Sequence, residues 1–386
     1  MRTELTIVEA ANPTRRKLGL ALCLALCSLA LGVSAHAKQP TIITFDPPGS
    51  VFTQAFAINP AGTITGVYAD GSFVFHGFLR TRDGAITTFD APGAGTGSGQ
   101  GTQPNSINPA GTIVGVYADG IGTLHGFVRA RDGNITTFDA PGAGTGIDQG
   151  TFGTNINPAG EIGGLYIDGS GVFHGFLRAL DGNITPFDAP GAGTGPGQGT
   201  DTINGDGLNS AGAIVGVYVN TGSIPDGTEV LHGYVRAADG TFNEFDVPGA
   251  GSGPGQGTVP EGINPAETIP GYFTDTSGVS HGFVRGKNGR ITIFDVAAAG
   301  TGAGQGTFAE NMNTPGEIDG NYIDASNVSH GFVRDKNGHI TSFDVPGAGT
   351  GAGQGTFSGG NNPEGAIPGF YIDASGVVHG FLRTAN

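Results

Sequence analysis

A three-residue signature, His-Gly followed by Phe or Tyr, recurs seven times in this chain and constrains its fold more than any other feature. Five of the six intervals between copies are 49 residues long, and the remaining one is 58. A fixed period of this length is typical of repeated supersecondary units that stack on one another. The copies begin at His76, His125, His174, His232, His281, His330 and His379.

Each copy contains four short segments of β-favouring residues separated by turn signals. Asn108-Pro109-Ala110-Gly111 suits a type I turn, with proline at the second position and a glycine able to take a positive φ. Asp83-Gly84 is the dipeptide of a two-residue type I′ hairpin, which has positive φ at both positions. That register pairs Phe78 directly with Phe89. One repeat therefore predicts a four-stranded antiparallel meander.

The two ends of the chain share one repeat between them. The last copy stops after His379–Asn386 without its Phe-Asp strand, while Thr41–Asp46 supplies such a strand near the N-terminus. A ring closed in this way leaves no unpaired edge, whereas a linear solenoid would need polar capping repeats. We therefore expect an all-β fold, a seven-bladed β-propeller of four-stranded antiparallel blades, closed by an N-terminal strand.

The first 37 residues have the layout of a cleaved secretory signal. Arg15-Arg16-Lys17 precedes the apolar run 18–33, and Ala35-His36-Ala37 supplies a small-residue cleavage site. The sequence thus predicts a signal peptide over 1–37, one propeller domain over 38–386, and a secreted or periplasmic bacterial protein. Arg15-Arg16 leaves both the general and the twin-arginine export routes open.

Cysteine content and net charge exclude several kinds of chemistry and partner. Cys23 and Cys27 both lie within the predicted signal, so the mature chain has no disulfide and no thiolate ligand. Removing residues 1–37 changes the net charge from −16 to −18. This charge argues against nucleic acid as a partner, because phosphates would be repelled. We also expect no membrane insertion after signal cleavage, and a monomer.

The recurring Ile-Asn-x-x-Gly and His-Gly-Phe segments resemble those of bacterial extracellular repeat proteins named for a His-Ala-Phe signature. The resemblance covers essentially the whole mature chain, although Gly77 and its six equivalents replace the alanine. It implies an exported, propeller-like array and adds little about activity.

The repeated histidines and the Phe-Asp carboxylates, from Asp46 to Asp344, are interpreted as structural because every copy carries them. A histidine and a phenylalanine two residues apart share a strand face, so the imidazole should cap an aromatic layer with one hydrogen bond. An aspartate before a Pro-Gly turn commonly accepts bonds from nearby backbone amides.

A second set of carboxylates, one in each unaltered loop between the second and third strands, predicts an acidic rim on one face. Such a rim could hold a divalent cation such as calcium, or a cationic ligand, although a solvated acidic surface is the simpler interpretation. The candidate metal ligands are Asp70, Asp119, Asp168, Asp324 and Asp373, and Asp275 is the remaining member of the set.

The fourth copy departs from the period through two insertions, six residues within 220–230 and three within 201–208. We expect both on the face that bears the acidic rim, the second of them before the first strand. Seven equivalent loops present equivalent chemistry, so a specific site needs such a break. The candidate ligand-binding residues are Asp201, Asn204, Asp206, Asn220 and Asp226, together with the neighbouring Asp168 or Asp275.

No catalytic constellation stands out from the repeat. The sequence therefore favours an exported binding or scaffold protein that presents an acidic loop face to a protein, a glycan or a cationic ligand. The alternatives are a secreted propeller enzyme, a hydrolase or lyase acting on carbohydrate, and a structural matrix component. No cofactor is firmly implied.

Overall fold

The computed structural model describes residues 40–202 and 206–385, which are almost entirely strands and tight turns. The predicted signal peptide, residues 1–37, and Asn204 lie outside the described residues. Within these two ranges, twenty-eight strands are joined by turns and by one short 3₁₀ helix, η1 (Ile224–Asp226). Within the described ranges no helix has the length and apolar character that a membrane crossing requires.

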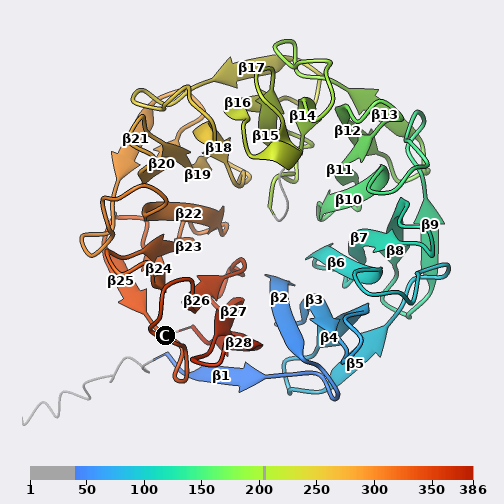
Figure 1. Ribbon diagram of the computed structural model, residues 1–386, viewed down its shortest axis with the longest axis horizontal. Coiled ribbons are helices and arrows are strands. Elements are labelled where there is room, and N and C mark those ends of the chain that lie inside the picture. Colours follow the sequence, from blue (N-terminus) through green and yellow to red (C-terminus); the bar gives the residue numbers. More distant parts are fainter. Residues whose placement is uncertain (1–39, 203–205, 386) are drawn as a thin grey trace, which may run out of the picture. The chain divides into compact units, whose positions relative to one another are not determined.

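Consecutive strands pair as antiparallel meanders of four that run outward from the centre of a ring (Figure 1). The innermost strands are β2 (Phe52–Ile58), β6 (Gly101–Ile107), β10 (Gly150–Ile156), β14 (Gly199–Asp201), β18 (Gln256–Pro260), β22 (Gly306–Met312) and β26 (Gly355–Ser358). The second strands are β3 (Ile64–Ala69), β7 (Ile113–Ala118), β11 (Ile162–Ile167), β15 (Ile214–Val219), β19 (Ile269–Thr274), β23 (Ile318–Ile323) and β27 (Ile367–Ile372).

The third strands carry the His-Gly-aromatic signature, and the outermost strands carry the Phe that precedes the Phe-Asp carboxylate. The third strands are β4 (Phe75–Arg80), β8 (Leu124–Arg129), β12 (Phe173–Arg178), β16 (Val230–Arg236), β20 (Ser280–Arg285), β24 (Ser329–Arg334) and β28 (Val378–Arg383). The outermost strands are β5 (Ile86–Phe89), β9 (Ile135–Phe138), β13 (Ile184–Phe187), β17 (Phe242–Phe245), β21 (Ile291–Phe294), β25 (Ile340–Phe343) and β1 (Ile42–Phe45).

The first strand of the ring closes the last unit. β1 pairs antiparallel with β28, placing Ile42 opposite Arg383 and Phe45 opposite Gly380, and the backbone N–H of Thr384 donates to the carbonyl of Thr41 (2.8 Å). The predicted pairing of the N-terminal strand with the last copy is confirmed. So is the all-β, closed, propeller-like architecture of repeated strand units.

A ring of asparagines provides a second closure at the Asn-Pro turns between first and second strands. The side-chain amide of Asn108 donates to the backbone carbonyl of Asn157 (3.4 Å), and Asn362 donates to Asn59 (3.4 Å). Asn264 departs from the pattern and reaches the sulfur of Met312 (3.3 Å). The other members that donate to the next carbonyl are Asn59, Asn157, Asn209 and Asn313.

The predicted hairpin register is wrong by one residue. The N–H of Thr81 donates to the carbonyl of Ala85, and the N–H of Gly84 donates back to Thr81 (both 2.9 Å). The loop thus has three residues, and Gly84 alone takes a positive φ of 95°. This is a type I turn followed by a glycine bulge rather than a type I′ turn. The extra residue places Phe89 opposite Gly77 and Phe78 opposite Thr88.

The aromatic pairs therefore form between units instead of within a hairpin. Phe89 of one unit meets Phe127 of the next edge to face at 6.1 Å, and the guanidinium of Arg129 lies 4.9 Å from the Phe89 ring. Phe127 is fully buried with Ile113 and Ala91. Each such aromatic pair contributes about 0.5–1.5 kcal/mol beyond area burial. The apolar core thus lies between adjacent units.

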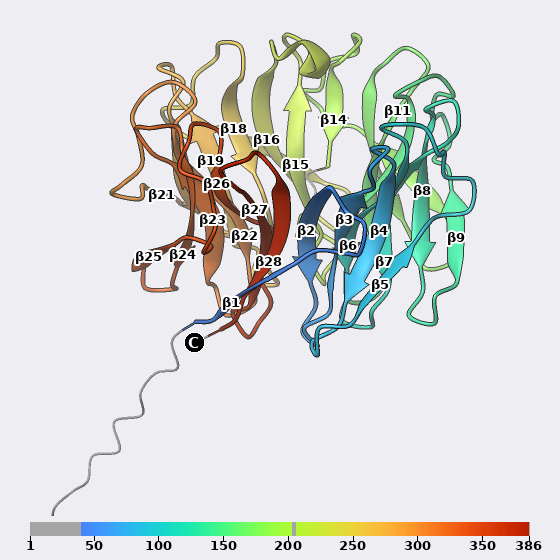
Figure 2. The same ribbon diagram turned by 60° about the horizontal axis from the view of Figure 1, so that its bottom comes forward.

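Antiparallel pairing places the Asn-Pro turns and the Asp-Gly hairpins at one end of the ring, called here the Asn-Pro face. The loops between second and third strands lie at the other end, the loop face (Figure 2). The innermost strands run between these two faces and form the wall of the central channel.

Candidate functional site

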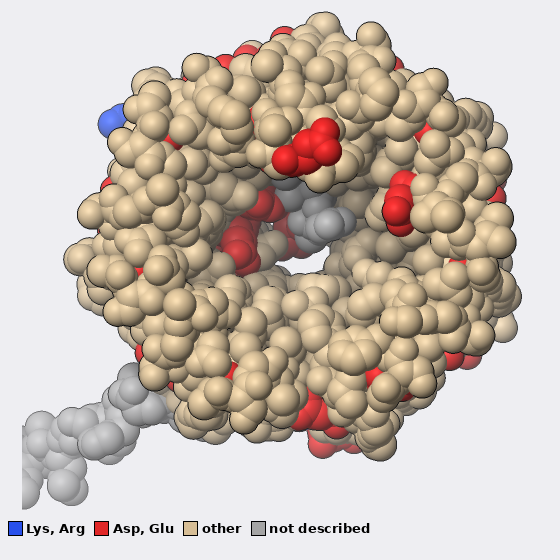
Figure 3. Space-filling model, viewed as in Figure 1, with Lys and Arg blue, Asp and Glu red and all other residues tan. Residues whose placement is uncertain are grey.

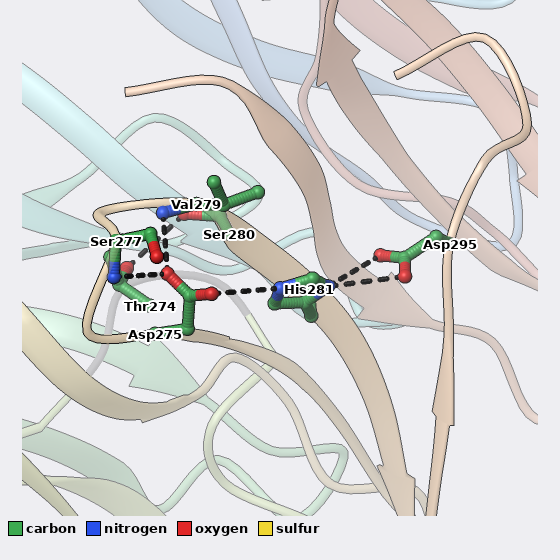
Figure 4. Close-up of polar contacts among 7 residues, drawn as sticks. All are labelled: Thr274, Asp275, Ser277, Val279, Ser280, His281 and Asp295. Carbon is green, nitrogen blue, oxygen red and sulfur yellow. Dashed lines mark hydrogen bonds and ion pairs between the residues drawn. The ribbon is translucent and has the colours of Figure 1, made fainter. Parts of the chain in front are cut away.

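The acidic rim predicted from the sequence is a set of separate turns, each of which uses its own carboxylate. Oδ1 of Asp275 accepts from the backbone N–H groups of Ser277 (2.8 Å) and Val279 (2.9 Å), as Figure 4 shows. These backbone hydrogen bonds, led by that of Val279, lower the pKa of Asp275. The same loop geometry holds Asp70, Asp119, Asp168, Asp324 and Asp373.

The repeated histidine links this rim to the Phe-Asp carboxylate of its unit. His281 Nδ1 lies 3.0 Å from Oδ1 of Asp295, its Nε2 lies 3.7 Å from Asp275, and its ring stacks on Phe273 at 5.1 Å (Figure 4). The Phe-Asp carboxylate therefore accepts from histidine, not from the turn amides that we predicted. The other histidines that bond their unit's carboxylate in this way are His76, His125, His174, His232, His330 and His379.

The loop insertion of the fourth unit lies on the loop face, as expected. Asn220 donates its side-chain amide to the carbonyl of Gly191 (3.2 Å), and Asp226 lies exposed in η1. Among residues 40–202 and 206–385, Asp226 does not join Asp168 and Asp275 in a group that could hold a metal ion.

The second insertion lies elsewhere than predicted. The fourth copy of the first strand begins at Gly199, so the extra residues follow β14 and interrupt this strand rather than precede it. Asp206 forms a parallel bridge with Gly262, and the N–H of Gly207 donates to Oδ1 of Asn155 (2.9 Å). These contacts place Asp206 on the channel wall, not on the loop face.

Two adjoining cavities open along this wall, and Glu261 lines both. The first, of about 290 Å³, is lined by Asp201, Glu229, Glu261 and Tyr272, and by Ile224 of η1 among its apolar residues. The second, called here the inner cavity, measures about 330 Å³. It is lined by Phe56, Asn105, Glu261, Glu310, Asn311, Ser358, Gly359 and Phe370. The inner cavity lies at the lower end of the range of small-ligand sites, about 300–1,000 Å³, and the first cavity lies just below it.

Carboxylates are concentrated on the inner wall of the central opening (Figure 3). We call Asp201, Asp206, Glu261 and Glu310 the channel carboxylates. Burial by the surrounding walls, together with a neighbouring carboxylate, raises the pKa of Glu261 and of Glu310 to about 8. Burial raises the pKa of Asp201 and of Asp206 to about 6. Water still reaches Asp206, which is exposed, and the other three are half-buried.

Sequence reasoning missed Glu261 and Glu310, although a signal was present. Glu310 occupies the fifth position of its first strand, where other units have Phe56, Asn105 and Thr154. Glu261 is its counterpart in the repeat and lies one residue beyond the end of β18. The predicted break in sevenfold symmetry is thus present on the strands that line the channel as well as in the insertions.

The described residues provide no preformed metal centre: across 40–202 and 206–385, no group of three or more His, Cys, Asp or Glu side chains could hold an ion. Carboxylates, amides and aromatic rings instead line a small cavity.

These features define a closed, propeller-like all-β protein with a polar cavity in its channel. A comparison with solved structures finds similarity to the BP39L lectin from Burkholderia pseudomallei. The identity is 12%, the match covers 91% of this chain and 100% of the lectin, and the TM-score is 0.50. At this identity the similarity concerns the fold alone.

Two further structures are less similar. A six-bladed β-propeller lectin from Aleuria aurantia matches 75% of this chain and 89% of its own at 13% identity, with a TM-score of 0.41. A puromycin hydrolase matches 86% of this chain and 55% of its own at 13% identity, with a TM-score of 0.46. Neither the family models nor the curated protein sequences give a match.

Proposed function

We propose that this chain is an exported seven-bladed β-propeller that binds a glycan in its central channel. The observation that carries the proposal is the inner cavity, where two carboxylates, two amides and two phenylalanine rings meet. Amides and carboxylates bond sugar hydroxyls, and an aromatic ring packs against the apolar face of a sugar. The fold shared with a bacterial lectin is consistent with this function.

A glycan array tests the proposal with purified residues 38–386. Binding of a defined glycan should disappear in Phe56→Ala and in Asn105→Ala, which shorten side chains that line the inner cavity. Phe152→Ala is a matched control because Phe152 is also a half-buried side chain of a first strand, yet lines neither cavity. An array without any hit, or equal binding by Phe56→Ala, would contradict the proposal.

The proposed export has its own test. N-terminal sequencing of the protein recovered from its native host should begin at Lys38, immediately after the predicted cleavage site. A mature chain that still begins at Met1 would contradict export by a cleaved signal.

Catalysis on carbohydrate is the second candidate, favoured by the raised pKa of Glu261 and Glu310, about 8 for each. Carboxyls that remain protonated near neutral pH can serve as general acids. Mass spectrometry of each glycan hit after incubation would show shortened products for a hydrolase or lyase, and unchanged glycan for a binding protein.

The acidic loop face and a bound calcium ion are further proposals. Thermal unfolding with calcium, and with chelator, tests both. A midpoint that rises with calcium in the wild type, and rises less in Asp275→Asn, would support them. An unchanged midpoint would contradict them.

A further inference from the structure

The channel wall has hydrogen-bond acceptors without donors. Asp319, on β23, is fully buried, and its Oδ1 has no partner, while its Oδ2 accepts from the N–H of Gly360 (3.3 Å). The carboxylates of Glu310 and Asp206 are the neighbouring charges that, after burial itself, raise the pKa of Asp319. The buried group therefore lies beside the channel carboxylates.

Two more acceptors share this condition. Oε2 of Glu229 is buried without a partner in a cavity that Glu261 also lines. Asn361 is 8% exposed, and its Oδ1 has no partner where it lines the Asn-Pro mouth of the channel with Asp206. A buried acceptor without a donor is costly, and in native structures it indicates a missing donor.

No cation of the described protein neutralises these groups. The ion pairs of residues 40–202 and 206–385 are histidine–aspartate pairs, Arg82 with Glu364, and Lys287 with Glu267. The arginines of the third strands, such as Arg129, lie over phenylalanine rings between units. Within the described residues, the channel carboxylates thus have no counter-charge.

Aromatic rings complete the wall of the inner cavity. Phe370 stacks on Phe357 with centroids 4.8 Å apart and planes 7° from parallel, and Phe56 also lines this cavity. Aromatic faces attract ammonium groups, and more strongly where water is excluded. The carboxylates and aromatic faces of the inner cavity, with the unpartnered Oδ1 of Asp319 beside Glu310, together favour an organic cation.

We propose that the glycan bound in the channel is an amino sugar whose free ammonium group is held by Glu261 and Glu310. This assignment rests on the proposed glycan-binding function. The ammonium donates three hydrogen bonds and supplies the missing positive charge. An N-acetylated sugar lacks that charge, so the channel distinguishes the two forms. The shared chemistry, a protonated primary amine, also occurs in aliphatic polyamines.

Isothermal titration calorimetry at pH 7.5 separates these sources. The probes are a β-1,4-linked glucosamine tetramer, its fully N-acetylated form, a neutral glucose tetramer and spermidine. We expect the glucosamine tetramer to bind at least about tenfold more tightly than the acetylated form, because the acetylated form offers the half-buried carboxylates no positive charge. Spermidine, which lacks sugar hydroxyls, should bind more weakly than the glucosamine tetramer.

Two isosteric variants and a control complete the experiment. Glu261→Gln and Glu310→Gln should each weaken glucosamine tetramer binding by about tenfold or more, and by more than they weaken binding of the glucose tetramer. Asp226→Asn is the control, since Asp226 is exposed in η1. Thermal unfolding confirms that each variant is folded.

Equal affinity for the free and acetylated tetramers would overturn the amino-sugar inference while leaving glycan binding intact. Binding of spermidine alone would overturn both the inference and the proposed function. A glucosamine preference that survives in both glutamine variants would overturn the assignment to Glu261 and Glu310.

Discussion

The side-chain amide of Asn362 donates a hydrogen bond to the backbone carbonyl of Asn59, 303 residues earlier in the chain (3.4 Å). Oδ1 of Asn362 also accepts from the N–H groups of Glu364 (3.1 Å) and Ala366 (2.9 Å). One side chain therefore fixes a turn and joins the last unit to the first. Since the side chain is 1% exposed, water cannot replace these bonds.

Asn362→Ala should lower the free energy of unfolding by about 1–3 kcal/mol, because it leaves buried backbone groups without partners. Urea titration measures the change. Asn134→Ala is the control, since Asn134 is exposed and its side chain bonds only Asp132 in its own turn. If both variants unfold at the same urea concentration, the asparagine ring does not stabilise closure.

The glycine of the His-Gly-aromatic signature is required by a close approach. A Cβ added at Gly77 would lie 2.7 Å from Cζ of Phe89, whereas one at Gly233 would lie 3.1 Å from Cζ of Phe245. Gly77→Ala should therefore cost about 1–3 kcal/mol, the usual range for overpacking, and Gly233→Ala should cost less. Thermal unfolding of the two variants ranks them. The reverse order, or equal stability, would show that the phenylalanine ring shifts freely.

Gly77 and its neighbours show which features of the fold could be predicted from the sequence. The period, the Asn-Pro turns and the closing strand are local or arithmetic features of the sequence, and all were predicted. The hairpin register was not, because Asp83-Gly84 suits both a two-residue and a three-residue loop. One added residue changes the strand partners of Phe78 and Phe89. The sequence therefore could not predict that the aromatic rings pack between units.

The candidate site was predictable only in part. Asp201 and Asp206 were selected because the insertion beside them breaks the repeat, and both do lie on the channel wall. Glu261 and Glu310 differ from their equivalents in other units, but nothing in the sequence indicates that they lie deep within the ring. Their importance depends on which strand is innermost and on the absence of a nearby cation, and these are properties of the assembled ring.

His232 provides a pH test of the loop-face network. Its hydrogen bonds to Asp246 (3.0 and 3.1 Å) raise its pKa above 6.5. The stabilisation from this pair is therefore complete below the unfolded pKa and disappears as pH rises through the folded one. NMR titration should show a lower His232 pKa in Asp246→Asn, and a smaller decrease in Glu244→Gln. An unchanged pKa in Asp246→Asn would contradict this assignment.

Glu310 should make stability fall as pH rises. Its folded pKa, about 8, exceeds its ordinary value of 4.5, so the protein favours the protonated form. Glu310→Gln remains neutral and keeps the acceptor for Asn321, which now bonds Oε1 (2.9 Å). The melting temperature of the variant relative to wild type should rise from pH 5 to pH 8 and then level off. Glu364→Gln, at an exposed position, should show no such trend. If the difference in melting temperature between Glu310→Gln and wild type does not change with pH, the pKa of Glu310 is not raised.

The ligand should bind where the sevenfold repeat is broken, in the channel, and not at the seven equivalent histidine sites on the loop face. Binding stoichiometry distinguishes these locations directly, because a repeated site is present in every unit whereas the inner cavity occurs once. Calorimetric titration of the folded protein with its best glycan should give one ligand per chain, with binding lost in Phe56→Ala. A stoichiometry near seven, unaffected by Phe56→Ala and reduced by replacing His281 with alanine, would contradict the account.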